Sequence, residues 1–332
     1  MTPIELLRAA HPCGIRLENP PAPVLPTIDD VLSAAARIAA YAQVTPVLRS
    51  SSLDLLAGCM IAFKCENFQR TGAFKFRGAC NAVFALDDAD ATRGVVTHSS
   101  GNHGAALALA ARLRGIPAHV VVPEGAVESK LVAIQAFGAQ LHRCAPTMAA
   151  REAECARLQA ATGARLVHPF ADPLVIAGQG TAALELHQQC EGLDALITPV
   201  GGGGLLSGSA IATRAVASGC AIWGAEPAMA CDARDSLQAG RLIDNAIPHT
   251  ICDGLRGHLA PITFAILRAN VDGIALADED EIVIAMQLLG QRLKIVVEPS
   301  AAVAFAVLLR HRDRFEGQRV GIVLSGGNRE LT

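Results

Sequence analysis

The chain has almost none of the aromatic residues that favour wet interfaces, with one tryptophan and one tyrosine among 332 residues. It also lacks an excess of positive charge, because 28 basic residues face 31 acidic ones and the net charge is −3. A surface that binds a polyanion usually carries a basic patch or stripe. The composition therefore gives no support to nucleic-acid binding.

Long apolar runs and a signal peptide are also missing. The stretch "AALALAARLRG" is too short and too charged to span a bilayer, and the start "MTPIELLRAAHPCG" lacks a basic segment followed by an apolar one. The ten cysteines are scattered and form no CxxC pair, which argues against a zinc site or a disulfide framework. These absences predict a cytoplasmic protein with no membrane contact.

What the sequence does contain is a regular alternation of short β-branched strands and longer helices, clearest from residue 94 onward. Helices of this length between short strands predict right-handed crossovers and parallel sheets. Strands are expected at residues 60–66, 95–99, 119–123, 140–144, 165–169, 195–200, 221–227 and 320–327. Helices are expected at residues 27–42, 103–115, 129–138, 147–163 and 178–190.

One lysine stands between two phenylalanines in "GAFKFRGA", residues 72–79. Burial disfavours the charged form of an amine and leaves the nitrogen a better nucleophile. The other interpretation is a lysine whose stem covers a helix start while its ammonium group stays in water. Lys75 is thus a candidate nucleophile that this octapeptide alone does not establish.

Three segments follow predicted strands, where open parallel sheets bind their ligands. The run Gly201–Gly204 in "PVGGGGLLSG" lets the backbone approach a phosphate at a helix start, and it matches neither a dinucleotide nor a nucleoside-triphosphate motif. "HSSGNHG", residues 98–104, is either an anion-binding helix start or a capping turn. "LSGGN", residues 324–328, is another strand end with small polar residues.

A fourth loop, "GAEPAMACD" at residues 224–232, places two acids across a short loop. Carboxylates with a carbonyl oxygen suit a hard divalent cation such as Mg²⁺ or Ca²⁺, although a solvated loop has the same composition. Taken together, an amine in apolar surroundings, a phosphate-binding loop and an anion-binding loop suit pyridoxal 5′-phosphate. Its aldehyde needs an amine and its phosphate needs backbone N–H groups.

At this point the sequence resembles the fold-type II pyridoxal-phosphate enzymes, in particular the serine racemase and serine/threonine dehydratase group. The resemblance runs from about residue 26 to the end and rests on motifs that occur in the family's order. The motifs are "CENFQRTGAFKFRGACNAV", "THSSGNHG", "VIAGQGT", "PVGGGG", "AEPAMACD", "VVEPSAA" and "VLSGGN".

The resemblance implies a role for each matching residue. Lys75 is implied to hold the cofactor covalently and then to take the Cα proton of the substrate. The implied cofactor-binding residues are Phe74, Lys75, Asn102, Gly201, Gly202, Gly203, Gly204, Leu205 and Ser325. The implied substrate-binding residues are Ser99, Ser100, Asn102, His103 and Arg151, and the implied cation ligands are Glu226, Ala230 and Asp232.

The resemblance predicts an ammonia-lyase that removes the β-hydroxyl of L-serine or L-threonine and yields a 2-oxo acid and ammonia. Ser100 leaves serine racemisation open as an alternative, because that reaction needs a second acid/base opposite Lys75. Arg151 leaves 3-hydroxyaspartate open as the substrate if its guanidinium faces the site, whereas a helix-surface arginine beside Glu152 and Glu154 would not select it. A non-catalytic protein that binds pyridoxal phosphate is the alternative of another class.

The implied architecture is two parallel-sheet α/β domains of the tryptophan synthase β type with the cofactor in the cleft between them. We expect an N-terminal extension at 1–26, a large domain at 27–93 and 172–332, and a small mobile domain at 94–171. A homodimer is also implied. Ala105 and Phe170 depart from the residues that contact an activating nucleotide in animal relatives, which argues against such activation.

Overall fold

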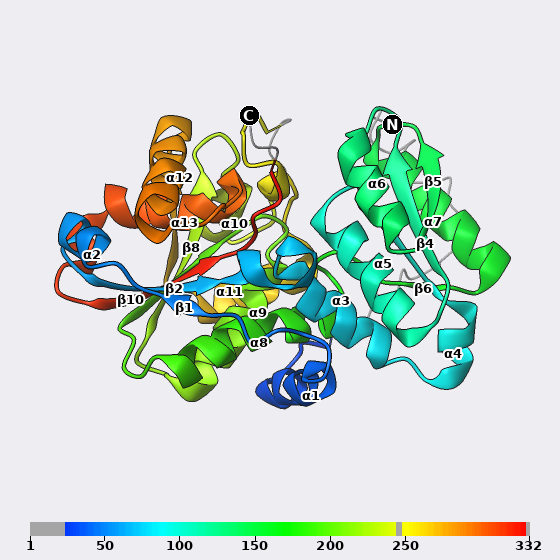
Figure 1. Cartoon of the computed structure of the whole chain (residues 1–332), viewed down its shortest axis with the longest axis horizontal. Coiled ribbons are helices and arrows are strands. Elements are labelled where there is room, and N and C mark those ends of the chain that lie inside the picture. Colours follow the sequence, from blue (N-terminus) through cyan, green and yellow to red (C-terminus); the bar gives the residue numbers. More distant parts are fainter. Residues whose placement is uncertain (1–23, 244–247, 330–332) are drawn as a thin grey trace, which may run out of the picture.

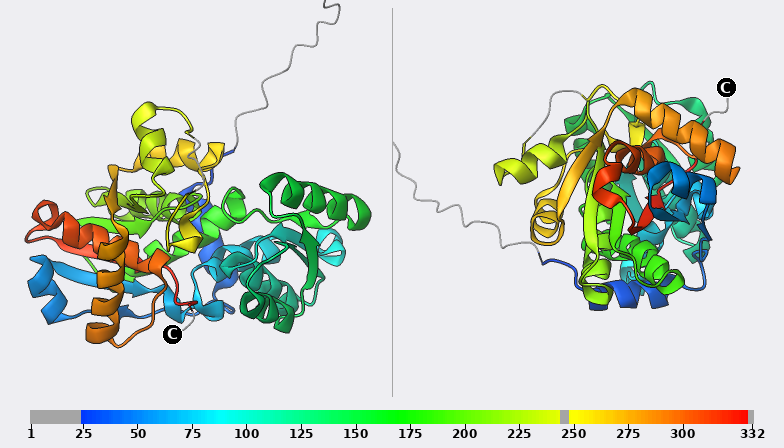
Figure 2. Two further views of the ribbon diagram at one scale, coloured as in Figure 1. Left: turned by 90° about the horizontal axis from the view of Figure 1, so that it is seen from above. Right: turned by 90° about the vertical axis from the view of Figure 1, so that its left-hand side faces the viewer.

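The computed structural model describes residues 24–243 and 248–329, which form two lobes, each built around its own sheet (Figure 1). Figure 2 shows the same separation of the lobes from above. Parallel strands dominate both sheets, so the predicted α/β fold with two parallel-sheet domains is confirmed. Residues 1–23 of the predicted N-terminal extension lie outside the described residues.

The larger sheet has the strand order β1-β2-β10-β7-β8-β9. Its strands are β1 (Val47–Leu48), β2 (Met60–Cys65), β7 (Ala195–Pro199), β8 (Ala221–Pro227), β9 (Gly273–Ala277) and β10 (Arg319–Leu324). All neighbours pair in parallel except β1, which runs antiparallel to β2 at the edge and was not predicted. The carboxyl ends of β2, β7, β8 and β10 therefore lie at one edge of the sheet.

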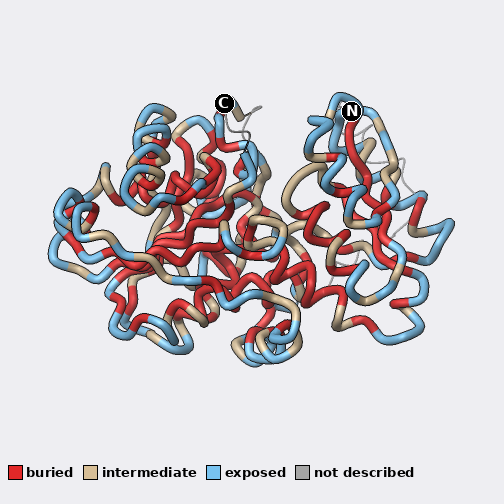
Figure 3. The backbone as a smooth tube through the Cα atoms, in the orientation of Figure 1, coloured by how far each residue is buried: buried red, intermediate tan, exposed pale blue. Residues whose placement is uncertain are grey.

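Helices cover both faces of this sheet, as parallel sheets require. Along β2, Ile61 and Phe63 face the core made with α12 (Glu279–Leu293) and α13 (Pro299–Arg310), whereas Ala62 faces the core made with α8 (Pro173–Gln189). Figure 3 shows buried backbone along both sheets. The other helices of this lobe are α1 (Ile28–Ile38), α2 (Ser51–Ala57), α9 (Gly204–Val216), α10 (Asp232–Ala239), α11 (Pro261–Asn270) and α14 (Arg312–Phe315).

The smaller sheet has the order β5-β4-β3-β6 and is parallel throughout. Its strands are β3 (Val95–His98), β4 (Ala118–Pro123), β5 (Gln140–Cys144) and β6 (Arg165–Leu166), and its helices are α4 (Asp88–Arg93), α5 (Asn102–Arg114), α6 (Glu128–Ala136) and α7 (Met148–Thr162). The predicted strand at 165–169 is shorter than expected. Residues after Leu166 leave the sheet and cross to the other lobe, where Pro169 and Phe170 make their contacts.

Helices α3 (Lys75–Phe84) and α8 join the lobes, and their backbones meet directly. A Cβ atom on Gly178 would lie 2.6 Å from the Cα of Gly78, closer than real side chains allow. Only glycine permits this approach. The contact fixes the start of α3, which carries Lys75.

No described helix is long and apolar enough to cross a membrane.

Candidate active site

Lys75 is the first residue of α3, and a left-handed turn at Thr71 and Gly72 precedes it. Its Nζ donates a hydrogen bond to the carbonyl oxygen of Pro169 at 2.9 Å and lies 5.0 Å from the centre of the Phe74 ring. Burial lowers the pKa of Lys75 to about 8, and the charge of Glu298 opposes part of that shift. A large neutral fraction near pH 8 suits an amine that must attack a carbonyl group.

The two phenylalanines that flank Lys75 lie in different environments. Because successive helical residues point about 100° apart, Phe74 and Phe76 cannot point in the same direction. Phe76 is fully buried in the core of the smaller lobe, whereas Phe74 stays half-buried beside the amine. The environment of the Lys75 amine is therefore made by Phe74 and by the segment around Pro169.

The glycine run follows β7 and leads into α9. Among the described residues, the backbone N–H groups of Gly201, Gly202, Gly203, Gly204 and Leu205 find no hydrogen-bond acceptor. Gly203 has φ = +84°, a conformation that glycine adopts without strain. Five free donors at the positive end of a helix form a ready site for a phosphate group.

Residues 168–170 connect the lysine to this loop. Pro169 accepts the Lys75 hydrogen bond, and the next side chain, Phe170, lies so close to Gly202 that a Cβ there would be 2.4 Å from the ring. The ring of His168 packs edge-on against Phe170 with centroids 4.6 Å apart. Burial and the charges of neighbouring groups lower the pKa of His168 to about 4, so its ring is neutral at physiological pH.

The serine-asparagine loop ends β3 and begins α5. Ser99 Oγ accepts the N–H of Gly101 at 3.4 Å, and the half-buried hydroxyl of Ser100 has no hydrogen bond to any described residue. His103 is buried with Nε2 3.2 Å from the carbonyl oxygen of Val167, while its Nδ1 has no partner in the described part of the chain. Burial, aided by the charge of Lys75, holds the pKa of His103 well below its usual range.

Asn102 is held between two other segments. Its amide nitrogen lies 3.1 Å from each carboxylate oxygen of Glu298, and its amide oxygen accepts a hydrogen bond from Asn328 at 2.9 Å. Glu298 is buried, and burial raises its pKa to about 7 while the bond from Asn102 opposes the shift. The sequence reasoning did not single out Glu298, since a glutamate before a proline is an ordinary helix N-cap.

Ser325 directly follows β10 and lies beside the lysine turn. Its carbonyl oxygen accepts the N–H of Phe74 at 2.9 Å, and Ala73 pairs with Gly326 in an isolated antiparallel bridge. The side chain of Ser325 is buried, and its hydroxyl makes no hydrogen bond to a described residue. A cleft of about 450 Å³ is lined by the lysine turn at Thr71, by Gly101 and Asn102, and by Asn328 after β10. The glycine run joins this region through the contacts of Pro169 with Lys75 and of Phe170 with Gly202.

Arg151 lies on α7, and its charge acts on His98, the last residue of β3 before the serine-asparagine loop. Burial lowers the pKa of His98, and the Arg151 charge lowers it further against the opposing charge of Glu152. The Nε of Arg151 is buried and no described residue accepts a hydrogen bond from it. Glu154 is already held by Arg157 through two contacts of 2.7 and 2.8 Å, so it does not neutralise Arg151.

The fourth loop lies away from the lysine, at the end of β8. The carboxylate of Glu226 accepts the N–H groups of Ala233 and Arg234 at the start of α10. Burial, with repulsion from Asp232, raises the pKa of Glu226 to about 8. Two acids that repel each other in a buried loop suit a divalent cation, yet no group of three or more metal-binding side chains exists among the described residues.

The residues around Lys75 fit pyridoxal phosphate. The amine with a pKa near 8 matches the aldehyde, and the five free N–H groups match the phosphate. The unbonded Ser325 hydroxyl can meet a ring nitrogen. These features define a site for a phosphate-bearing aldehyde cofactor between two lobes.

Comparison with known proteins agrees with that class. A sequence model of the family "Pyridoxal-phosphate dependent enzyme" matches residues 38–326, and the chain belongs to this family. It is 46% identical over 307 residues to the beta-hydroxyaspartate dehydratase of Paracoccus denitrificans, covering 92% of this chain and 98% of that protein. It is 46% identical to the L-threo-3-hydroxyaspartate ammonia-lyase of Saccharomyces cerevisiae over 93% of this chain and 95% of that protein.

Solved structures give the same answer. The crystal structure of the serine racemase from Dictyostelium discoideum superposes with a TM-score of 0.89 and 47% identity, covering 92% of this chain and 99% of that one. The chain is therefore a pyridoxal-phosphate-dependent enzyme whose relatives are ammonia-lyases and amino-acid racemases. The alternative of a non-catalytic binding protein is set aside.

Proposed function

We propose that this enzyme is an ammonia-lyase for β-hydroxy amino acids and that its preferred substrate carries a second carboxylate, as 3-hydroxyaspartate does. The net reaction removes the β-hydroxyl and the amino group and yields a 2-oxo acid and ammonia. L-Serine and L-threonine remain substrates of the same chemistry. Support for the preference comes from Arg151 and from two relatives whose names specify hydroxyaspartate.

The unpaired guanidinium of Arg151 carries this proposal. Arg151 is half-buried, and its buried Nε has no acceptor among the described residues. A planar guanidinium pairs well with a carboxylate. The acid best placed to neutralise it along the helix, Glu154, is held by Arg157. A carboxylate brought by the substrate would complete the pairing.

Each remaining residue has a proposed task. Pyridoxal phosphate, when bound, supplies an aldehyde that captures amines and a ring that accepts electrons. The N–H groups of Gly201–Gly204 and Leu205 hold its phosphate, Phe74 packs beside it, Asn102 bonds its ring hydroxyl and Ser325 faces its ring nitrogen. Lys75 moves the Cα proton of the substrate, and Ser99, Ser100 and Asn102 with neighbouring backbone N–H groups hold the α-carboxylate. His103, in the same loop, lies on the side where Arg151 would meet the second carboxylate.

The test compares release of 2-oxo acid from L-threo-3-hydroxyaspartate, L-serine and L-threonine. Loss of a charge-assisted pair of about 1.5–3 kcal/mol lowers kcat/KM by about 10- to 150-fold. We expect Arg151→Gln to lose about that much on hydroxyaspartate and to change little on serine. Arg157→Gln, on the same helix but paired with Glu154, is the matched control. Equal losses of kcat/KM on hydroxyaspartate and serine would contradict the proposed contact of Arg151 with the substrate. If no substrate yielded a 2-oxo acid, the proposed lyase activity would be wrong.

Serine racemisation is the second candidate, because the Ser100 hydroxyl is uncommitted and the D. discoideum relative is a racemase. The reaction needs a proton donor on the opposite side of the substrate from Lys75. Chiral analysis of serine left after partial reaction tests this. D-Serine that forms in the wild-type enzyme but not in Ser100→Ala would support it.

Four further proposals concern a bound cation, the motion of the domains, the oligomeric state and the location of the enzyme. A divalent cation binds at Glu226, the Ala230 carbonyl and Asp232, where it would relieve the repulsion between the acids. Residues 94–171 move as a small domain against 27–93 and 172–332. The enzyme acts as a homodimer. Its location is cytoplasmic, in keeping with the nine unpaired thiols of the described residues.

A further inference from the structure

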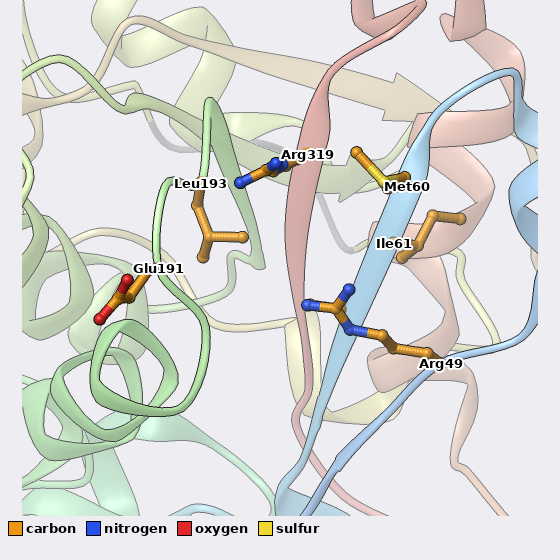
Figure 4. Close-up of a pocket in the computed structure, with 7 residues that line it drawn as sticks. Arg49, Met60, Ile61, Glu191, Leu193 and Arg319 are labelled. Carbon is orange, nitrogen blue, oxygen red and sulfur yellow. The ribbon is translucent and has the colours of Figure 1, made fainter.

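A second cavity lies at the edge of the large sheet opposite the cofactor site. The strands β2 and β10 begin here, at Met60 and Arg319, whereas the site residues follow their other ends. The cavity has a volume of about 240 Å³ (Figure 4). It is lined by Arg49, Met60, Ile61, Ala62, Glu191, Leu193 and Arg319.

Two guanidinium groups line this cavity, and neither forms an ion pair with a described residue. No described carboxylate lies within ion-pair distance of Arg49 or Arg319, although Glu191 lines the same cavity. In Figure 4 the guanidinium of Arg319 points toward Leu193, and the carboxylate of Glu191 is turned away from both arginines. Two positive groups that line one cavity without an ion pair favour binding of an anion there.

Neighbouring groups contact both arginines. One Nη of Arg49 contacts the sulfur of Cys190 at 3.6 Å, at the end of α8. The carboxylate of Asp194 accepts the Arg319 backbone N–H at 2.8 Å and forms no ion pair with the Arg319 guanidinium. Gly192 has φ = +68° and lies close to the guanidinium of Arg319. A Cβ atom on Gly192 would be 3.1 Å from Nη1 of Arg319.

We propose that this cavity is an anion site that takes a small dianion, either a phosphate group or a short dicarboxylate. Each guanidinium presents a planar fork of donors that matches a carboxylate or phosphate edge. Cavities that hold drug-sized ligands measure about 300–1,000 Å³, so one of 240 Å³ suits a smaller ligand. Arg49 and Arg319 are exposed, so both guanidinium groups are accessible to a dissolved anion, and Ile61 and Leu193 form apolar walls beside them.

The test is calorimetric titration of the cofactor-loaded enzyme with inorganic phosphate and, separately, with succinate, in a chloride buffer. Loading the cofactor occupies the glycine-run phosphate site. We expect saturable binding of at least one probe, weakened by about tenfold or more in Arg49→Gln and in Arg319→Gln, as loss of a bidentate charged pair implies. Arg312→Gln, an exposed arginine elsewhere, should bind like the wild type, and acetate should bind far more weakly than either probe.

The two probes distinguish the sources of the dianion, since the tighter one identifies the ligand class. Arg151→Gln serves as a further control for succinate, because any binding in the catalytic cleft should disappear there instead. If neither probe binds, or if both bind equally well to Arg49→Gln and Arg319→Gln, the proposal is wrong. If a glutamine variant does not fold, Arg49→Lys replaces it. That variant keeps the charge but loses the fork, and should still bind measurably more weakly.

Discussion

The amine of Lys75 donates to the carbonyl oxygen of Pro169, so the nucleophile of one lobe is held by a chain segment that comes from the other. The amine must leave this acceptor to react. Its burial already lowers the pKa to about 8, which raises the fraction of neutral nitrogen at physiological pH.

The first prediction concerns this pKa. When cofactor-free enzyme is mixed with pyridoxal phosphate, the initial rate at which visible absorbance appears should rise with pH and level off above about 8. Glu298→Gln should move the midpoint to lower pH, because the Glu298 charge raises the lysine pKa. Lys75→Ala should give no visible band. A wild-type midpoint near the ordinary lysine value of about 10.4 would contradict the prediction.

The second prediction concerns the glycine run. Gly202→Ala places a Cβ 2.4 Å from the Phe170 ring, so the loop or the ring must shift. A strain of about 1.4 kcal/mol would weaken cofactor binding about tenfold, measured by equilibrium dialysis. Gly219→Ala is the control, since nothing lies within 4 Å of its added Cβ. Phe170→Ala added to Gly202→Ala should restore part of the affinity, and failure to do so would show that the clash is not the cause.

The third prediction is a stability change with pH. In the folded state the pKa of Glu298 is raised to about 7 from its usual range, so the folded protein binds more protons than the unfolded one between about pH 4.5 and 7. The Glu298 contribution to the free energy of unfolding is therefore present below the unfolded pKa and is lost as the pH rises toward 7. Glu298→Gln removes this dependence. The variant's Tm minus the wild-type Tm, from thermal melts at pH 5 to 8, should increase with pH, and a constant difference would contradict the assignment.

The fourth prediction concerns the cation loop. Because burial and Asp232 raise the pKa of Glu226 to about 8, a cation must displace a proton there, and its affinity should increase as the pH rises toward 8. Millimolar Mg²⁺ or Ca²⁺ should raise the Tm of the wild type, and a chelator should reverse it. Glu226→Gln should abolish the effect, whereas the exposed Glu316→Gln should keep it. An equal effect in both variants would mean binding elsewhere.

The fifth prediction tests motion between the lobes. Lys130 on α6 and Asp253 on the other side of the cleft form an ion pair of 2.5 Å that is partly exposed on both sides. Exposed pairs contribute about 0.2–1 kcal/mol, so Lys130→Glu should raise KM severalfold at most. Adding Asp253→Lys should restore the wild-type KM. Additive effects of the two changes would show that the pair does not help to close the cleft.

The sequence predicted the alternation of strands and helices from β3 to β8 because β-branched strands and helix caps are local signals. It did not predict α10 to α14 or β9. Strand β9 is only half-buried and α13 is buried on almost every side, so neither shows the two-sided pattern that marks an element in the sequence. The antiparallel β1 is two residues long, too short for any periodicity.

The candidate site was predicted as a set of loops, since glycine, serine and asparagine after strands mark ligand-binding ends. Their arrangement depends on contacts between distant segments that no local pattern contains. Glu298 appears in the sequence as an ordinary cap, and its importance becomes visible only when Asn102, 196 residues away, donates to it. The separate roles of Phe74 and Phe76 likewise follow from where α3 begins.

The bare contact between Gly78 and Gly178 makes the scaffold intolerant at a point remote from the chemistry. A single methyl group added to either helix would act as a wedge and tilt Lys75 away from the phosphate loop. The reacting residues themselves would be unchanged in the sequence. Libraries that randomise only the cleft will therefore overlook a pair of positions able to silence the enzyme on their own.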